Sequence, residues 1–171
     1  MKFEKVIDKV HNFHLQGRTI DCAHWLLKKY NLETENLKAI ELREIAKPDF
    51  ILMTTEGNFG EPQVLRIPQN TFEFPLTLML ALFKHEMVHV RQKTVFPFVE
   101  DKNEREWQAY FDMNFHSIFS EICEMSTFHK LFFAKKGLEY YNRMGENSEL
   151  QLKYVDQKIA VDNLIASLDQ I

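Results

Sequence analysis

The sequence predicts an α+β protein in which helices dominate and a small antiparallel or mixed sheet precedes one buried helix. Glycine is scarce, with 5 residues, whereas phenylalanine is abundant, with 15, and this balance favours helices that pack through aromatic side chains. Short β-type runs are confined to residues 37–67, between segments whose apolar residues recur at helical spacing. Neither proline nor glycine interrupts residues 76–93, and the first half of this stretch is apolar on every face, as in a buried helix.

The chain begins with two predicted helices. Residues 2–15 carry apolar side chains at helical spacing, and Gly17 ends this pattern. A second helix is expected to begin near Thr19 or Asp21 and to continue through the segment CAHWLLKKY. The chain is long enough to bury one core, and we expect a single domain over residues 1–171.

Three β-strands are expected next. The segment LKAIELREI alternates around Ile40 and Leu42, which is typical of a half-buried strand. Two further runs, DFILMTT and QVLRI, have β-type composition, and the segment EGNFGEP between them is a strong turn signal. Residues 50–67 should therefore form a β-hairpin shortly before the buried helix.

Helices are expected to fill the rest of the chain. Pro75 suits the first turn of the buried helix, and Pro97 ends the loop that follows this helix. The polar segment EDKNERE then opens a helical stretch that reaches Lys136 and is closed by Gly137, either as one long helix or as two with a bend. A last helix is expected over residues 148–169.

Charge and hydropathy exclude several classes of function. The net charge of −4 and a pI near 6.0 give no electrostatic basis for binding nucleic acid. The N-terminus lacks the apolar block of a signal peptide, and the longest apolar run, FPLTLMLALF, is too short to span a membrane. We therefore expect a cytoplasmic protein that binds neither nucleic acid nor membranes, with Cys22 and Cys123 as buried free thiols.

The segment FKHEMVHVRQ places reactive side chains on the buried helix. His85 and His89 are four residues apart, so their rings lie one turn apart on one helix face and can chelate a single tetrahedral zinc ion. Glu86 points about 100° around the helix, where it can remove a proton from water and later deliver it to a leaving amine. Without partners, the burial of these three side chains would cost several kcal/mol, and this favours a metal site over a solvated helix face.

Catalytic zinc needs a third protein ligand and one coordination position left for water. The polar segment NEREWQAYFD, in the next helix, offers Glu104 and Glu106 on different faces of that helix. Glu100 and Asp101 lie too close to the preceding loop, and His116 follows ten residues after Glu106. Spacing alone leaves the choice between the two glutamates open, although both cannot reach one metal ion equally.

The pattern HEMVH, followed 17 residues later by Glu106 in the context EWQA, resembles the gluzincin metallopeptidases. Their signature is HExxH on one helix and a glutamate ligand in an ExxA or ExxxD turn of the next helix. The resemblance covers roughly residues 75–112 and implies a zincin-like fold, bound Zn2+ and hydrolysis of a peptide or protein substrate. By position it makes His85, His89 and Glu106 the metal ligands and Glu86 the general base.

Other polar residues near this motif receive different roles. Glu104 is expected to be a solvated residue of the first helical turn, favoured there by the helix dipole. Many gluzincins carry an aspartate four residues after the ligand glutamate, where this chain has Tyr110, a candidate for orienting a ligand histidine. Trp107 is expected in the core. Several side chains are chemically able to stabilise the oxyanion of amide hydrolysis: Arg91, Tyr110, His116, Tyr140 and Tyr141.

Other interpretations use the same residues. A catalytically inactive zincin-fold protein would act as a binding or structural module, but such a relative is expected to lose Glu86 first, and Glu86 is present. A further interpretation directs catalysis at one intracellular target, as in a toxin or a phage-encoded protein. Glu86-x-x-His89 is also half of the motif of ferritin-like di-iron bundles, which require a second ExxH that this sequence lacks.

Overall fold

The computed structural model describes residues 2–115 and 125–169. This part of the chain divides into two compact units. The first unit holds residues 2–98, and the second holds residues 99–115 and 125–169. A single domain over the whole chain stays a prediction.

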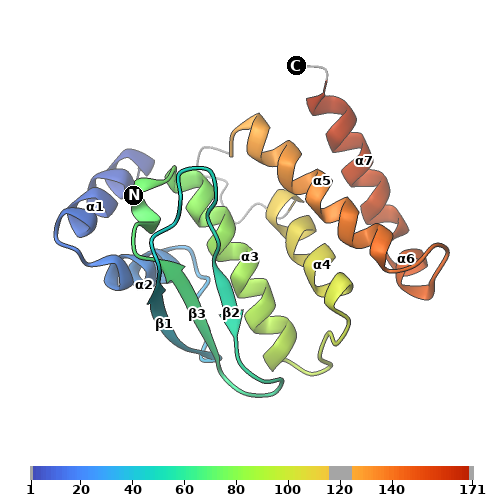
Figure 1. The fold of residues 1–171 in the computed structure, drawn as a ribbon, viewed down its shortest axis with the longest axis horizontal. Helices are drawn as coiled ribbons and strands as arrows, with labels where there is room; N and C mark the ends of the chain where they lie inside the picture. The colour runs from blue at the N-terminus through green and yellow to red at the C-terminus, as the bar shows by residue number, and fades with distance from the viewer. Residues whose placement is uncertain (1, 116–124, 170–171) are drawn as a thin grey trace. The chain divides into compact units, whose positions relative to one another are not determined.

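The first unit follows the predicted element order closely (Figure 1). Its elements are α1 (Phe3–Leu15), α2 (Thr19–Lys29), β1 (Leu37–Arg43), β2 (Thr54–Glu56), β3 (Gln63–Pro68), the 3₁₀ helix η1 (Thr71–Glu73) and α3 (Leu76–Thr94). Gly17 follows α1 with a φ of +66°, a left-handed conformation that glycine adopts without strain and that commonly ends a helix. The two predicted N-terminal helices, the first strand and the buried helix are thus confirmed.

The three strands form a mixed sheet in the order β1-β3-β2. Because β3 pairs parallel with β1 and antiparallel with β2, the predicted hairpin is confirmed. Its first strand is shorter than expected, since residues 50–53 lie outside β2. Ala46 lies in the loop before β2, and the side chain of Asn70, which follows β3, accepts a hydrogen bond from the Ala46 amide (2.8 Å) and donates one to the Ala46 carbonyl oxygen (3.1 Å). The backbone of Ala46 is therefore satisfied without a neighbouring strand.

The two faces of the sheet differ in character. Leu65 of β3 is fully buried, and Thr55 of β2, its partner in register, shares this inner face. On the outer face, the Arg66 guanidinium lies 3.3 Å from Glu41 and 3.2 Å from Glu56, which links all three strands. Among the described strands β2 pairs with β3 alone, so β2 is an edge strand.

Helix α3 is buried along most of its length, as its apolar sequence predicted. Its polar side chains are buried with the apolar ones, and those between 1% and 8% exposed are Lys84, His85, Glu86, His89 and Gln92. Buried polar groups are unfavourable unless they form hydrogen bonds or ion pairs. The hydrogen-bond partners of these buried polar side chains therefore indicate which chemical roles the side chains can have.

Over its described residues, the second unit contains α4 (Lys102–Phe115), α5 (Thr127–Arg143), α6 (Glu149–Lys153) and α7 (Val155–Leu168). Ser126 caps the start of α5, so the long helical stretch predicted here consists of separate helices. The prediction that Gly137 closes a helix is wrong, because α5 continues through this residue. The predicted last helix is interrupted at Tyr154, whose backbone angles (φ −111°, ψ 15°) separate α6 from α7.

Trp107 lies in the core of the second unit with an exposed fraction of 0%, as predicted. It packs against Tyr141 of α5, at 5.0 Å between ring centroids, and belongs to the same buried cluster as Val161 of α7. Packing also explains Gly137, because a Cβ atom at this position would lie 3.1 Å from the Cβ of Tyr110. The glycine allows α4 and α5 to approach closely, and it serves packing instead of helix termination.

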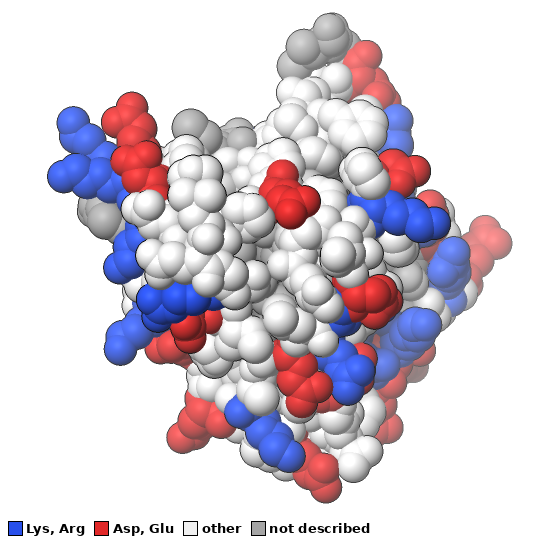
Figure 2. Space-filling model, turned by 60° about the vertical axis from the view of Figure 1, so that its left-hand side comes forward, with Lys and Arg blue, Asp and Glu red and all other residues white. Residues whose placement is uncertain are grey.

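The charged side chains on the surface of the described residues do not point to a particular binding partner. On the face drawn in Figure 2, basic and acidic side chains are interspersed, and neither kind forms a patch of its own. None of the described helices combines the length and the apolar character needed to cross a membrane.

Cys22 is a buried free thiol, as predicted, and this burial raises its pKa to about 12, whereas Cys123 lies outside the described residues.

Replacing Gly137 with leucine should destabilise the protein, because α4 and α5 approach too closely at this point to hold the new side chain. Overpacking of this kind typically costs about 1–3 kcal/mol of unfolding free energy. Urea unfolding followed by circular dichroism measures the change. Lys135→Leu, at an exposed position of the same helix, is the control, and equal stability of the two variants would contradict the close approach.

Candidate metal centre

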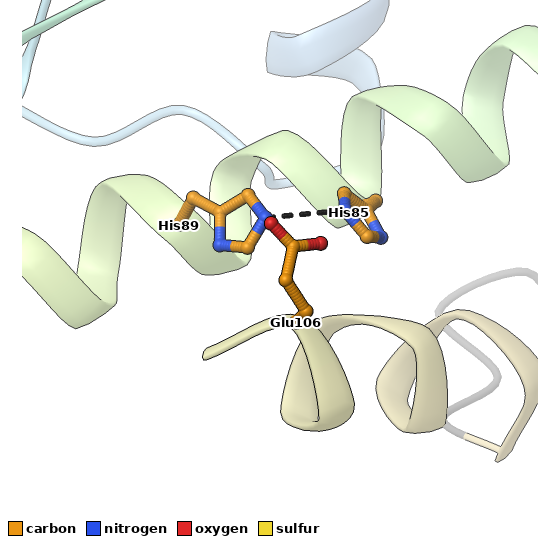
Figure 3. Close-up of side chains that lie close together, drawn as sticks. All are labelled: His85, His89 and Glu106. Atoms are coloured by element: carbon orange, nitrogen blue, oxygen red, sulfur yellow. Dashed lines mark hydrogen bonds between the residues drawn. The ribbon is translucent and has the colours of Figure 1, made fainter. Parts of the chain in front are cut away.

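Two imidazole rings lie next to one another on α3, with the edge of one toward the other. His85 and His89 lie one turn apart, with ring centroids separated by 4.7 Å and ring planes at 88°. Their Nε2 atoms are 3.1 Å apart, and Figure 3 marks this contact with a dashed line. Two nitrogen ligands at about 2.0–2.1 Å from one tetrahedral ion would be about 3.3 Å apart. The predicted pair therefore presents its nitrogens at close to the separation that a shared metal ion requires.

Gln92 orients one of these histidines. Its Oε1 atom lies 2.8 Å from Nδ1 of His89, and both side chains are buried. An amide oxygen can only accept a hydrogen bond, so Nδ1 carries the proton and Nε2 keeps its lone pair for a metal ion. This role of Gln92 was not predicted from the sequence. The available signal was its position three residues after His89, which places both side chains on one helix face.

The carboxylate of Glu86 is held by the edge strand of the sheet. The Thr55 hydroxyl lies 2.9 Å from Oε2 of Glu86 and 3.0 Å from the Glu86 carbonyl oxygen. Glu86 is only 6% exposed, so this hydroxyl contributes to satisfying a buried acid. Thr55 could not be predicted from the sequence, because 31 residues separate it from Glu86 and only the packing of β2 against α3 brings the two together.

Glu106 lies on α4 and is partly buried. One carboxylate oxygen of Glu106 and one ring nitrogen of each histidine all lie within 4.8 Å of one another, and Figure 3 shows the three side chains. No other group of histidine, cysteine, aspartate or glutamate side chains in residues 2–115 and 125–169 meets this condition. Two imidazole nitrogens and one carboxylate oxygen form a donor set that suits a divalent metal ion. The candidate triad therefore consists of the three residues proposed from the sequence.

Glu104, the rival third ligand, is engaged within the second unit. Its Oε1 atom accepts hydrogen bonds from the Tyr154 hydroxyl (2.6 Å) and from the Lys153 ammonium (2.7 Å). The prediction of a solvated residue is wrong, because Glu104 is only 8% exposed. Burial, together with the hydrogen bond to Glu104, raises the pKa of Tyr154, and the bond to the same carboxylate raises the pKa of Lys153.

The engagement of Glu104 also indicates on which side of α4 the side chain of Glu106 lies. Residues two apart on an α-helix project about 200° apart around its axis. Because Glu104 reaches the junction of α6 and α7, the side chain of Glu106 leaves α4 on nearly the opposite side. One glutamate is thus bound into the second unit while the other is directed away from those partners.

The described residues that were proposed to stabilise the oxyanion differ in their surroundings. Tyr141 is buried, and its hydroxyl donates a hydrogen bond to a backbone carbonyl of α6 (3.0 Å). The ring of Tyr110 stacks on that of Tyr140, with centroids 5.9 Å apart. Arg91 is exposed, and His116 lies outside the described residues. The oxyanion-stabilising residue stays a prediction, as does the role of Tyr110 in orienting a histidine.

Comparison of the chain with protein-family models, with curated protein sequences and with solved structures gives no match. The chemistry of this centre is therefore inferred from its own residues and their geometry.

Proposed function

We propose that this protein is a zinc-dependent metallopeptidase that hydrolyses peptide bonds in a peptide or protein substrate. His85, His89 and Glu106 would hold the zinc ion, and Glu86 would be the general base. The observation that carries this proposal is a three-residue donor set next to a buried carboxylate that a hydroxyl from β2 holds in place. A purely structural zinc site typically has four protein ligands and needs no neighbouring base.

When bound, zinc supplies a Lewis acid that polarises a carbonyl group and makes water acidic near neutral pH. The chain's own contribution is a set of three ligands, which leaves a coordination position for water or substrate. Gln92 supports this arrangement by fixing the tautomer of His89 that presents Nε2. A fixed ring orientation reduces the reorganisation that metal binding requires.

Glu86 is suited to transfer a proton because its carboxylate is buried and is oriented by Thr55. As general base, the carboxylate takes a proton from the water molecule whose oxygen attacks the substrate carbonyl carbon. The resulting carboxyl group then donates this proton to the amide nitrogen as the carbon–nitrogen bond breaks. The hydroxyl of Thr55 holds the acid in one orientation through both transfers.

The position of β2 supports a peptide as the substrate. β2 is an edge strand, and its central residue, Thr55, contacts the proposed base. An extended peptide can add to such an edge through backbone hydrogen bonds. This arrangement would bring a backbone amide of the substrate toward Glu86 without selecting any particular side chain.

Zinc binding should depend on Glu106 and not on Glu104. The wild-type chain should bind about one zinc ion, and His85→Ala or Glu106→Gln should abolish this binding because each removes a ligand. Glu104→Gln is the matched control. It should keep the zinc, because its amide oxygen can still accept from Tyr154 and hold α4 in place, but it should lower the unfolding free energy by about 1–3 kcal/mol, since the hydrogen bonds to Tyr154 and Lys153 lose the carboxylate charge. Metal analysis and urea unfolding measure both effects, and full zinc occupancy in Glu106→Gln would contradict the third-ligand assignment.

Glu86→Gln should keep the zinc and the fold but lower peptide hydrolysis by a factor of about 10²–10⁴, because the amide cannot accept the proton of water. Cleavage of a peptide library followed by mass spectrometry measures the loss. Glu41→Gln, an exposed change on the outer face of the sheet, is the control and should cleave like the wild type. Undiminished cleavage by Glu86→Gln would exclude the proposed base.

Gln92→Leu should weaken zinc binding by about 10–100-fold, because His89 loses the acceptor that fixes its tautomer. Gln92→Glu retains an acceptor at the same place and should keep most of the affinity. Competition with a zinc-binding dye measures both values. Arg91→Leu, at the exposed neighbouring position, controls for general effects on α3, and equal affinities of the two leucine variants would refute the role of Gln92.

A further inference from the structure

One backbone carbonyl of β2 already accepts a hydrogen bond from a side chain. Nζ of Lys93 donates to the Thr55 carbonyl oxygen at 3.0 Å. The same threonine contacts the proposed base, because its hydroxyl lies 2.9 Å from Oε2 of Glu86. Both contacts arise where β2 packs against α3 (Figure 1). A lysine of the metal-binding helix thus uses a backbone acceptor of the strand that orients the base.

The pairing of β3 shows which way this carbonyl points. The Gln63 amide donates to the Asn36 carbonyl oxygen at 2.8 Å, so the backbone groups of Gln63 point to the β1 side of the sheet. Backbone groups of successive strand residues alternate between the two sides, and the irregularity in this pairing lies on β1, not on β3. Leu65 therefore points away from β2. Its partner Thr55 forms a non-hydrogen-bonded pair with it, and both backbone groups of Thr55 face the free edge.

Thr55 is accordingly the residue of β2 with which an added peptide would exchange backbone hydrogen bonds. Whether the peptide adds parallel or antiparallel, one of its N–H groups is directed at the Thr55 carbonyl oxygen. Nζ of Lys93 already lies at the distance from this oxygen that an amide nitrogen of a neighbouring strand would have. A second donor would have to share the oxygen beside a cation. One N–H group of the bound peptide is therefore left without a good acceptor.

Proline avoids this cost because it has no N–H group. An N–H group that leaves water without finding an acceptor makes binding less favourable. The backbone of proline is also compatible with an edge strand, provided that its nitrogen faces no required acceptor. Proline keeps its carbonyl group, so the Thr55 N–H, which faces the same edge, can still donate to the peptide.

We propose that Lys93 makes this protein select peptides with proline at the position that faces the Thr55 carbonyl. This inference rests on the proposed peptidase function and adds a substrate class to it. The selection acts through the N–H group that proline lacks, so it requires no pocket for a particular side chain. Because the Thr55 hydroxyl contacts Glu86, this position lies within about two residues of the bond that is cut.

Binding can be measured without cleavage in the full chain that carries Glu86→Gln and is loaded with zinc. Fluorescence anisotropy would follow labelled polyalanine-based peptides in which proline or N-methylalanine replaces one alanine at each position in turn. Both replacements remove the N–H group, whereas only proline adds a ring, so an effect that they share reports the N–H group. At one position both should strengthen binding by about fivefold or more.

Variants of the lysine test whether it causes the preference. Lys93→Met makes the Thr55 carbonyl available, so the alanine peptide should bind at least as tightly as the proline peptide. Both peptides are measured on the same variant, and the loss of any further contact of Lys93 therefore cancels in the comparison. Lys93→Arg keeps a cationic donor and should keep the preference. Lys28→Met, at an exposed position of α2, should also keep it.

Three results would overturn the inference: no position at which removal of the N–H group strengthens binding, an unchanged preference in Lys93→Met, or no measurable binding of any peptide. The first and third are read on the chain that keeps Lys93, so they do not depend on the folding of a lysine variant. Melting temperatures show whether Lys93→Met folds, and Lys93→Ala is a second variant without the ammonium group.

Activity of the wild-type chain distinguishes this inference from the proposed function. If the wild type cleaves peptides without preferring those that carry proline, the role of Lys93 is wrong and the peptidase remains. If proline peptides bind with the expected dependence on Lys93 but the zinc-loaded wild type cleaves none of them, the peptidase is wrong and the binding site remains.

Discussion

Burial of polar side chains on α3 is the constraint on which the candidate centre depends. Two imidazoles, a carboxylate and an amide are each at most 8% exposed, and an unsatisfied buried polar group costs about 1–3 kcal/mol. Hydrogen-bond partners for these side chains come both from the same helix and from a distant part of the sequence. Gln92 reaches His89 from three residues away on the same helix, whereas Thr55 reaches Glu86 from the sheet. Because little water competes for these hydrogen bonds, they orient the side chains more firmly than exposed bonds would.

Two glutamates on α4 show how helix geometry divides chemically identical groups. Glu104 and Glu106 are separated by one residue, yet the first accepts from Tyr154 and Lys153 while the second belongs to the candidate triad. Both bonds to Glu104 come from the junction of α6 and α7, so they help to set the rotation of the first turns of α4, together with the buried Trp107. The direction in which the side chain of Glu106 projects depends on this rotation. A residue without any part in metal binding thereby contributes to the geometry of one that is proposed to bind it.

Features that depend on local spacing could be predicted from the sequence, whereas features that depend on distant partners could not. The buried helix and the histidine pair follow from residues within a few turns of one another, and the structure confirms both. Glu104 was predicted incorrectly because its partner Tyr154 is 50 residues away. Thr55 was missed for the same reason, since it is 31 residues from Glu86 and the two meet only because β2 packs on α3. Gly137 was predicted incorrectly because a glycine that allows close packing looks, in sequence, the same as one that ends a helix.

The shortness of β2 has a kinetic consequence. Residues Thr54–Glu56 offer few backbone groups along the free edge, because hydrogen-bonding groups in an antiparallel strand alternate between its two sides. A peptide held there mainly by its backbone would dissociate fast, since differences in affinity are expressed mostly in the dissociation rate. For the proposed peptidase, both fragments of a cut chain would leave quickly, and product release would not limit turnover. The same short edge gives a second copy of the chain little backbone to pair with, which limits edge-to-edge aggregation.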